Sequence, residues 1–180
     1  INDEFYDEDI KAEQVSKDLG VEFIHADILD WEPTFEKESI DAVMSFDTIE
    51  HLHHSPRNLY RLMSQCLKPK GLFLIGGPNA ANLFKRFRVP LGKNINCNLE
   101  EWYMHKKFIG HVREPIVSDL KFIAKDVGLE NIEIFGRNWM GLEKMNGFVR
   151  KAGNIFSNVL SLFPTLCSNI YVIGSKKDKI

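Results

Sequence analysis

The chain has 180 residues, enough for one domain with a sizeable hydrophobic core. Hydrophobic residues make up 44% and charged residues 27% of the sequence, which is typical of globular proteins. The formal net charge of -2 gives no overall positive field, so we do not expect the chain to bind nucleic acid.

The cysteines and the apolar runs indicate a cytoplasmic protein. Cys66, Cys97 and Cys167 are far apart and form no Cys-x-x-Cys pair, so the usual zinc and dithiol spacings are absent. A reducing compartment fits this pattern best. No apolar run reaches the roughly 18 residues that a membrane span needs, and the acidic start predicts no signal peptide.

The first part of the chain predicts one helix and two strands. Residues 1–20 carry a weak helical stripe of apolar residues, and Gly20 is suited to end that helix. Alternating, partly β-branched residues over 21–25 predict a strand. The apolar run 40–46 has the length and composition of a buried strand.

A helix and a further strand follow. Ser55 and Pro56 are a typical helix start, with serine as the N-cap and proline in the first turn. The Lys-Pro-Lys-Gly segment at 68–71 is expected to stop that helix and turn the chain. The apolar run 72–75 then predicts a short strand.

The second half alternates helices and strands after a long insert. Residues 80–112 show little periodicity, and such long connections often serve as lids or ligand-binding segments. Residues 118–127 and 142–163 predict helices, and residues 129–135 and 170–174 predict strands. The order indicates a single α/β domain over the whole chain, with a mostly parallel sheet and helices on both faces.

Polar side chains gather where two of these strands end. Asp47, Glu50 and His51 follow the strand at 40–46, and Gly-Gly-Pro-Asn79 follows the strand at 72–75. In open parallel sheets, ligands bind beyond the carboxyl ends of the strands. We therefore expect the functional site at these two turns.

These turns also carry a family resemblance. Two segments closely resemble the region from the end of strand 4 to strand 5 of class I S-adenosylmethionine-dependent methyltransferases. They are Asp47-Thr-Ile-Glu-His-Leu and the later Leu-Lys-Pro-Lys-Gly-Leu-Phe-Leu-Ile-Gly-Gly-Pro-Asn. Residues 21–28, 111–129 and 169–176 resemble that family's strand 3, the segment before strand 6 and the antiparallel strand 7. The resemblance implies a Rossmann-like fold, S-adenosyl-L-methionine as cofactor and a methyltransferase activity.

Two features of that family are absent from the sequence. The glycine-rich loop after strand 1 has no counterpart, and the acidic residue after strand 2 has only Asp3 or Asp7 as a stand-in, with no strand before them. The family's sheet order, 3-2-1-4-5-7-6, implies that strand 3 would have no partner without strands 1 and 2. We therefore expect an N-terminally incomplete domain, short by roughly 40 residues as judged from usual βαβ sizes, with a degenerate relative as the alternative.

The resemblance implies five cofactor-binding residues. Asp27 would lie near the adenine amino group and Ile28 against the adenine face, while Phe46, Asp47 and Glu50 would frame the rest of the cofactor pocket. Each has a simpler alternative. An aspartate at the end of a strand often only bonds its own turn, and Glu50 could simply hydrogen-bond the backbone of its loop.

Catalytic and substrate-binding roles are expected for four further residues. His51 and His111 are candidate general bases, since imidazole titrates near neutral pH. Asn79 and Arg113 are candidate contacts to the acceptor, because arginine offers forked donors to carboxylates or phosphates. The alternatives are an ordinary turn at Asn79 and a structural ion pair of Arg113, for instance with Glu114.

No metal site is predicted, because the sequence does not place partners around the histidine-rich run 51–54, which is better explained as a solvated loop. Residues 84–88 mix aromatic and basic side chains, which suits either contact with a membrane surface or a solvated helix with two core anchors. We expect O- or N-methylation of a small molecule or of a glycan or lipid-linked acceptor. The alternative is a non-catalytic module that binds a protein partner.

Overall fold

The computed structural model describes residues 3–106, 108–138 and 146–178. The chain divides into two compact units, Ile1–Trp31 and Glu32–Ile180, and each is described by itself.

The first unit contains helix α1 (Asp3–Asp18), as the sequence predicted. Gly20 ends it with a φ of +69°, a left-handed conformation that glycine adopts without strain. The Gly20 N–H donates to the carbonyl of Lys17 and the Val21 N–H to the carbonyl of Ser16. This pair of bonds is a Schellman motif, which satisfies the last carbonyls of the helix.

The predicted strand at 21–25 is wrong. These residues form no strand, and Val21 and Phe23 are 56% and 39% exposed. A strand is stabilised by backbone bonds to neighbouring strands, and no strand in the described part of the chain pairs with this segment.

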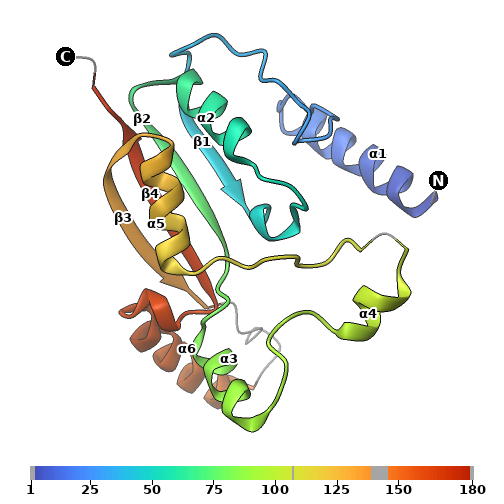
Figure 1. The fold of residues 1–180 in the computed structure, drawn as a ribbon, viewed down its shortest axis with the longest axis vertical. Helices are drawn as coiled ribbons and strands as arrows, with labels where there is room; N and C mark the ends of the chain where they lie inside the picture. Colours follow the sequence, from blue (N-terminus) through green and yellow to red (C-terminus); the bar gives the residue numbers. More distant parts are fainter. Residues whose placement is uncertain (1–2, 107, 139–145, 179–180) are drawn as a thin grey trace. The chain divides into compact units, whose positions relative to one another are not determined.

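The second unit is built on a four-stranded sheet with the order β1-β2-β4-β3 (Figure 1). Strand β1 (Ile40–Phe46) runs parallel to β2 (Leu67–Pro78). Strand β4 (Asn169–Lys176) runs antiparallel to both β2 and β3 (Leu129–Arg137). Strands β1, β2 and β3 are therefore parallel to one another, and β4 is antiparallel to them. The order β1-β2-β4-β3 confirms the expected order of the family's strands 4, 5, 7 and 6.

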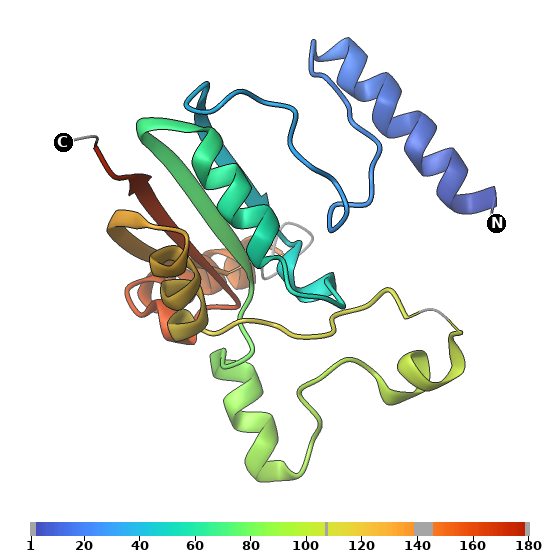
Figure 2. The ribbon, with the colours of Figure 1, turned by 45° about the horizontal axis from the view of Figure 1, so that its top comes forward.

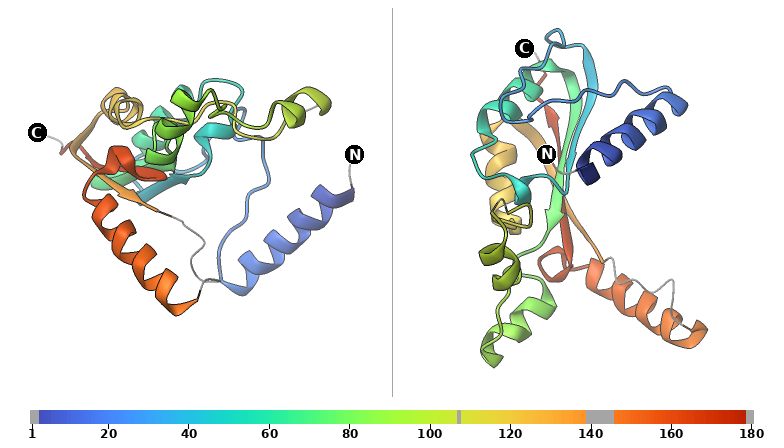
Figure 3. Two further views of the ribbon diagram at one scale, coloured as in Figure 1. Left: turned by 90° about the horizontal axis from the view of Figure 1, so that it is seen from below. Right: turned by 90° about the vertical axis from the view of Figure 1, so that its right-hand side faces the viewer.

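Helices cover both faces of the sheet. Helices α2 (Arg57–Cys66) and α5 (Val117–Asp126) pack on one face, and α6 (Gly147–Ser161) leaves from the other (Figure 3). The Ser55 hydroxyl accepts the Arg57 N–H at 3.3 Å, so α2 starts one residue later than predicted. For the predicted helix at 142–163, residues 142–145 lie outside the described residues.

Strand β2 begins five residues before the predicted start. Ile40 pairs with Leu67 and Ala42 with Leu72, so the predicted turn at 68–71 is a bulge within the paired strand. Lys70 has a φ of +63° there, which bends the strand without ending its pairing.

The insert at 80–112 contains α3 (Leu83–Arg88), the short 3-10 helix η2 (Val89–Leu91) and α4 (Leu99–Met104). In Figure 2 the chain leaves β2, forms α3 and α4, and returns in extended form toward α5. Phe84 and Phe87 are 56% and 66% exposed, so they are not the core anchors that one alternative proposed. Two further 3-10 helices are η1 (Ile49–His51) and η4 (Pro164–Leu166).

The core lies between the sheet and the α2–α5 layer. Phe73 and Ile75 of β2 and Leu120 of α5 are at most 1% exposed, and the Tyr60 ring meets Phe73 edge to face at 5.7 Å. Among the described helices, none has the length and apolar character needed to cross a bilayer.

Gly76 gives a first test of this packing. A Cβ atom at Gly76 would lie 2.1 Å from Cδ1 of Tyr171, whose ring stacks on Phe135. We expect Gly76→Ala to lower the free energy of unfolding by about 1–3 kcal/mol, because the ring must move out of its stack. Urea unfolding measures this. Gly147→Ala is the matched control, since that position is open, and an equal effect there would contradict the explanation.

Candidate functional site

The turn after β1 places an acidic side chain inside the protein. Asp47 adopts a φ of +47°, a conformation that aspartate tolerates better than most residues, and its N–H donates to the carbonyl of Gly76. The chain then enters η1, which turns the Glu50 side chain into the interior, where it is only 1% exposed.

Glu50 is a buried carboxyl group. Within the described part of the chain, neither of its carboxylate oxygens has a hydrogen-bond partner. Burial raises the pKa of Glu50, and the nearby charge of Asp47 adds to that direction. Gly77 makes room for the group, because a Cβ there would lie 3.0 Å from Oε2.

The two histidines predicted as bases lie together. The rings of His51 and His111 meet edge to face, with centroids 4.8 Å apart. The Glu50 backbone carbonyl accepts the Val112 N–H at 2.6 Å, which ties the segment after the insert to η1. Glu50, His51 and His111 each offer a ligand atom, and these atoms lie within 4.8 Å of one another.

Further groups orient both rings. Nδ1 of His51 lies 2.9 Å from the carbonyl of Ile109. Nδ1 of His111 lies 2.9 Å from a carboxylate oxygen of Glu114, whose other oxygen pairs with Lys85. Sequence reasoning considered Glu114 only as an ion-pair partner of Arg113; its place three residues after His111 was the available signal.

The predicted substrate residues differ in their surroundings. Asn79 is 1% exposed and its amide donates to the carbonyls of Thr165 and Cys167, while its oxygen accepts the Ala81 N–H. These bonds favour the structural alternative. The Arg113 side chain is 81% exposed and lies 3.9 Å from Asp119, so it keeps donors free for a ligand.

The predicted cofactor residues fall in both units. Asp27 and Ile28 belong to the first unit, where the Asp27 carboxylate accepts the Leu29 N–H and Ile28 is 39% exposed. Phe46, at the end of β1, is 41% exposed and meets the Tyr171 ring edge to face at 5.6 Å. Asp47 is exposed at the same strand end.

A cavity of about 290 Å³ adjoins the histidine pair. The cavity is lined by His53, Asn94, Asn96, Cys97, Leu99, Trp102, Phe108, His111 and Val112. Apart from His53, these residues belong to the insert at 80–112, so the insert, which includes the predicted catalytic residue His111, forms most of the wall.

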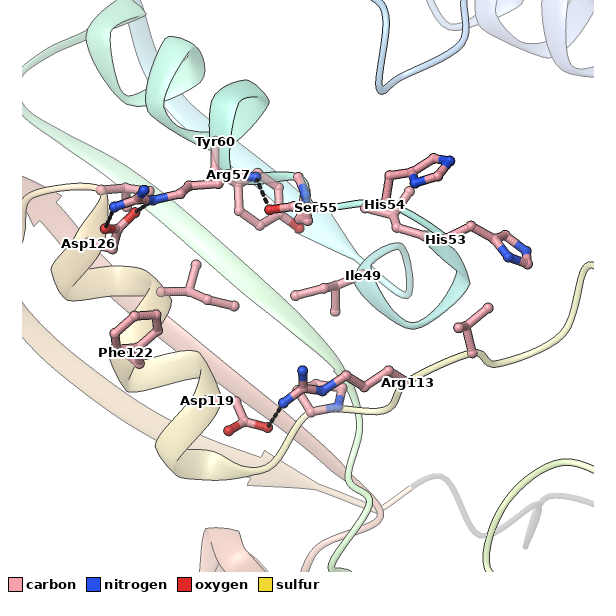
Figure 4. Close-up of a pocket in the computed structure, with 16 residues that line it drawn as sticks. Ile49, His53, His54, Ser55, Arg57, Tyr60, Arg113, Asp119, Phe122 and Asp126 are labelled. Carbon is pink, nitrogen blue, oxygen red and sulfur yellow. Dashed lines mark hydrogen bonds and ion pairs between the residues drawn. The ribbon is translucent and has the colours of Figure 1, made fainter.

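A larger cavity of about 550 Å³ lies between α2 and α5 (Figure 4). Arg57 spans one end of it to Asp126, and Arg113 approaches Asp119 at the other. Ile49, Tyr60 and Phe122 contribute to its apolar lining.

The Arg57–Asp126 ion pair should make the stability of the fold depend on pH. Hydrogen bonding to Arg57, with a further contribution from Arg61, lowers the pKa of Asp126 to about 2. Because the pKa in the folded protein lies below the value in the unfolded chain, the pair stabilises the fold above pH 4, and this is lost as the pH falls toward 2. We expect Asp126→Asn to lower the melting temperature at pH 7 more than at pH 2.5. Equal losses at both pH values would contradict the role of the ion pair.

One family model and several solved structures are similar to this chain. Residues 4–75 match the family model Methyltransf_11, described as a methyltransferase domain. A search of curated proteins found no match.

Solved structures of low sequence identity share the fold. A possible histamine N-methyltransferase from Thermotoga maritima has 11% identity and a TM-score of 0.58, over 92% of this chain and 69% of that one. An S-adenosylmethionine-dependent methyltransferase from Archaeoglobus fulgidus has 17% identity and a TM-score of 0.50, over 91% and 80%. Phosphoethanolamine N-methyltransferase 2 of Haemonchus contortus, solved with S-adenosyl-L-methionine, has 17% identity and a TM-score of 0.53, over 93% and 40%. The model of a methyltransferase domain thus matches residues 4–75, and the chain has the fold of S-adenosylmethionine-dependent methyltransferases.

Proposed function

We propose that this domain methylates a hydroxyl or amino group of a small molecule, or of a glycan or lipid-linked acceptor of which one sugar or head group enters the site. The observation that carries the proposal is the 290 Å³ cavity, because His111 is part of its wall. Cavities of this size suit small ligands. The Haemonchus contortus protein, named for phosphoethanolamine, is one relative in fold whose acceptor is small.

Methyl transfer mainly requires alignment. The acceptor atom, the methyl group and the leaving sulfur must lie in line, and water must be excluded. We infer that the carboxylates of Asp47 and Glu50 favour the positively charged sulfonium of the cofactor. An imidazole of the His51–His111 pair then accepts the proton of the acceptor group.

We propose the insert at 80–112 as the segment that covers the acceptor. In α4, the side chains of Trp102, Tyr103 and Met104 are 56–76% exposed, which suits a surface that closes on a ligand. The same exposure also favours the alternative, a module that binds a protein partner through α4. Saturable binding of the cofactor distinguishes the two. The three free cysteines support a cytoplasmic location.

The third prediction concerns His111. We expect the full product of the gene to transfer label from methyl-labelled S-adenosylmethionine to a compound in a small-molecule extract. His111→Gln should lower that rate by about 100-fold, the usual contribution of a general base. His54→Gln, in the exposed loop nearby, should retain the rate. Equal rates for both variants would remove His111 from catalysis, and labelling of macromolecules only would contradict the small acceptor.

A further inference from the structure

The cavity of about 550 Å³ between α2 and α5 has no role in the proposed function (Figure 4). We propose that this cavity binds a small amphipathic molecule that carries one anionic group, such as a carboxylate, a sulfonate or a phosphate monoester. The apolar body of the ligand lies between Ile49 and Phe122, and Arg113 binds the anionic group. The volume fits, since small-molecule sites usually measure about 300–1,000 Å³.

The walls of the cavity offer an apolar surface to a ligand. Ile49 of η1 and Phe122 and Ile123 of α5 belong to its lining. The Phe122 ring is 71% exposed there. Removal of apolar surface from water is favourable, so the body of a ligand is stabilised by contact with this ring.

One end of the cavity is closed by a tight ion pair. Arg57 donates to both carboxylate oxygens of Asp126, at 2.9 and 2.7 Å. Arg61 adds a third bond to the same carboxylate at 3.1 Å. Arg57 therefore already has its partner, and the anionic group of a ligand is not expected at this end.

The other end holds an arginine with donors free for a ligand. Nη2 of Arg113 lies 3.9 Å from Oδ2 of Asp119, which is beyond hydrogen-bond distance, and the Arg113 side chain is 81% exposed. The same Oδ2 atom accepts the Ile116 N–H at the start of α5. A guanidinium group binds a carboxylate or a phosphate through two parallel N–H bonds, and Arg113 can form such a pair with a ligand.

The charges at the cavity favour an anion over a cation. The Asp126 carboxylate already has two arginine partners. Asp119 faces Arg113 and lies in the first turn of α5, where the helix dipole stabilises its negative charge. A cationic ligand would therefore compete with arginine for both carboxylates, whereas an anion meets the exposed guanidinium group of Arg113.

This cavity differs from the one in which we propose that the acceptor binds. Arg113 lines the cavity of 550 Å³ and His111 lines the cavity of 290 Å³, while His53 and Val112 belong to both walls. The two cavities are therefore neighbours. The ligand of Arg113 is then a second molecule beside the acceptor, which goes beyond the proposed function.

Two dyes test the site without an acceptor or a cofactor. The dye 8-anilinonaphthalene-1-sulfonate combines an aromatic body with one anionic group, and N-phenyl-1-naphthylamine has the same body without the sulfonate. We expect one molecule of the anionic dye to bind per chain of the full product of the gene, with a rise in its fluorescence. A folded protein that does not bind the anionic dye would overturn the proposal.

A pair of arginine variants locates the anionic group. Arg113→Gln should weaken binding of the anionic dye at least about 10-fold, because hydrogen bonds to a charged group are lost. The same variant should bind the neutral dye as the parent does. Arg88→Gln, at an exposed position of α3, should change neither affinity. An anionic dye that binds equally to the parent and to Arg113→Gln, or that is weakened equally by Arg88→Gln, would overturn the role of Arg113.

A pair of phenylalanine variants locates the apolar body. Phe122→Ala should weaken binding of both dyes about 5-fold or more, whereas Phe148→Ala, at a position of α6 that is 84% exposed, should weaken neither. If the two variants behave alike, the dyes bind elsewhere and the proposal is wrong. Circular dichroism and cooperative thermal unfolding check that each variant is folded, because the anionic dye also binds partly folded chains.

Displacement of the bound anionic dye identifies the kind of ligand. Sodium decanoate represents fatty acids, and 1-naphthyl phosphate represents aromatic phosphate esters. Displacement by one of them supports the site and names the class of its ligand. Displacement by neither would overturn the assignment to amphipathic anions.

Titration of the same samples with S-adenosylhomocysteine separates this site from the proposed function. Retained cofactor binding without dye binding would overturn only the amphipathic-anion site. Dye binding that depends on Arg113, without cofactor binding, would support this site and contradict the methyltransferase function.

Discussion

Replacement of Asn79 by alanine is expected to lower the free energy of unfolding by about 3–5 kcal/mol, because each buried polar group left without a partner costs about 1–3 kcal/mol. Asn79 is 1% exposed, and its amide joins the end of β2 to the carbonyls of Thr165 and Cys167. Its side-chain oxygen accepts the Ala81 N–H. The substitution removes the bonds to the Cys167 carbonyl and the Ala81 N–H, whereas the Thr165 carbonyl keeps the bond that it accepts from Arg86.

Urea unfolding followed by circular dichroism measures this effect. Asn98→Ala is the matched control, because Asn98 caps the exposed helix α4 through one bond and should cost about 1 kcal/mol or less. If Asn79→Ala keeps full stability but loses methyl transfer, the result would contradict the structural role and support the predicted contact of Asn79 with the acceptor.

Replacement of Glu50 by methionine is expected to have opposite effects on stability and function. Glu50→Met should raise the free energy of unfolding by about 1–3 kcal/mol, because it keeps a similar volume and removes a buried carboxyl group that has no hydrogen-bond partner among the described residues. Methyl transfer should be lost, since the variant has no carboxylate at this position for the cofactor. Functional sites often retain such locally unfavourable groups.

Thermal unfolding, together with the labelling assay, tests this pair of effects. Glu100→Gln, on the first turn of the exposed α4, should leave both quantities nearly unchanged. A clear loss of stability in Glu50→Met would show that the carboxylate has a stabilising partner, and would contradict the account of the site.

The sheet of the second unit was largely predictable because each strand carries a continuous apolar run. The bounds of β1 were predicted as observed, and the sheet order agrees with the resemblance. The failures have local causes. Residues 21–25 have the composition of a strand but pair with none of the described strands, and Lys70 and Gly71 have the composition of a turn but lie in a bulge.

The candidate site was predictable where a strand end carries the chemistry. His51 lies in the turn after β1, and the family motif pointed to His111; the structure brings the two rings together. The pairing of His111 with Glu114 and Lys85 was not predictable, because Lys85 lies in the irregular insert. For Asn79 the position at a strand end was misleading, since the hydrogen bonds of its side chain favour a structural role.

The measurement that tests the central claim most directly is calorimetric titration of S-adenosylhomocysteine into the full product of the gene. We predict saturable binding of one molecule per chain in the micromolar range, about -8 kcal/mol. Asp47→Asn should weaken this binding. Asp41→Asn should not, because Asp41 is an exposed aspartate of β1 that pairs with Lys68 of β2. A folded protein that binds no S-adenosylhomocysteine would contradict the methyltransferase function and favour the partner-binding module.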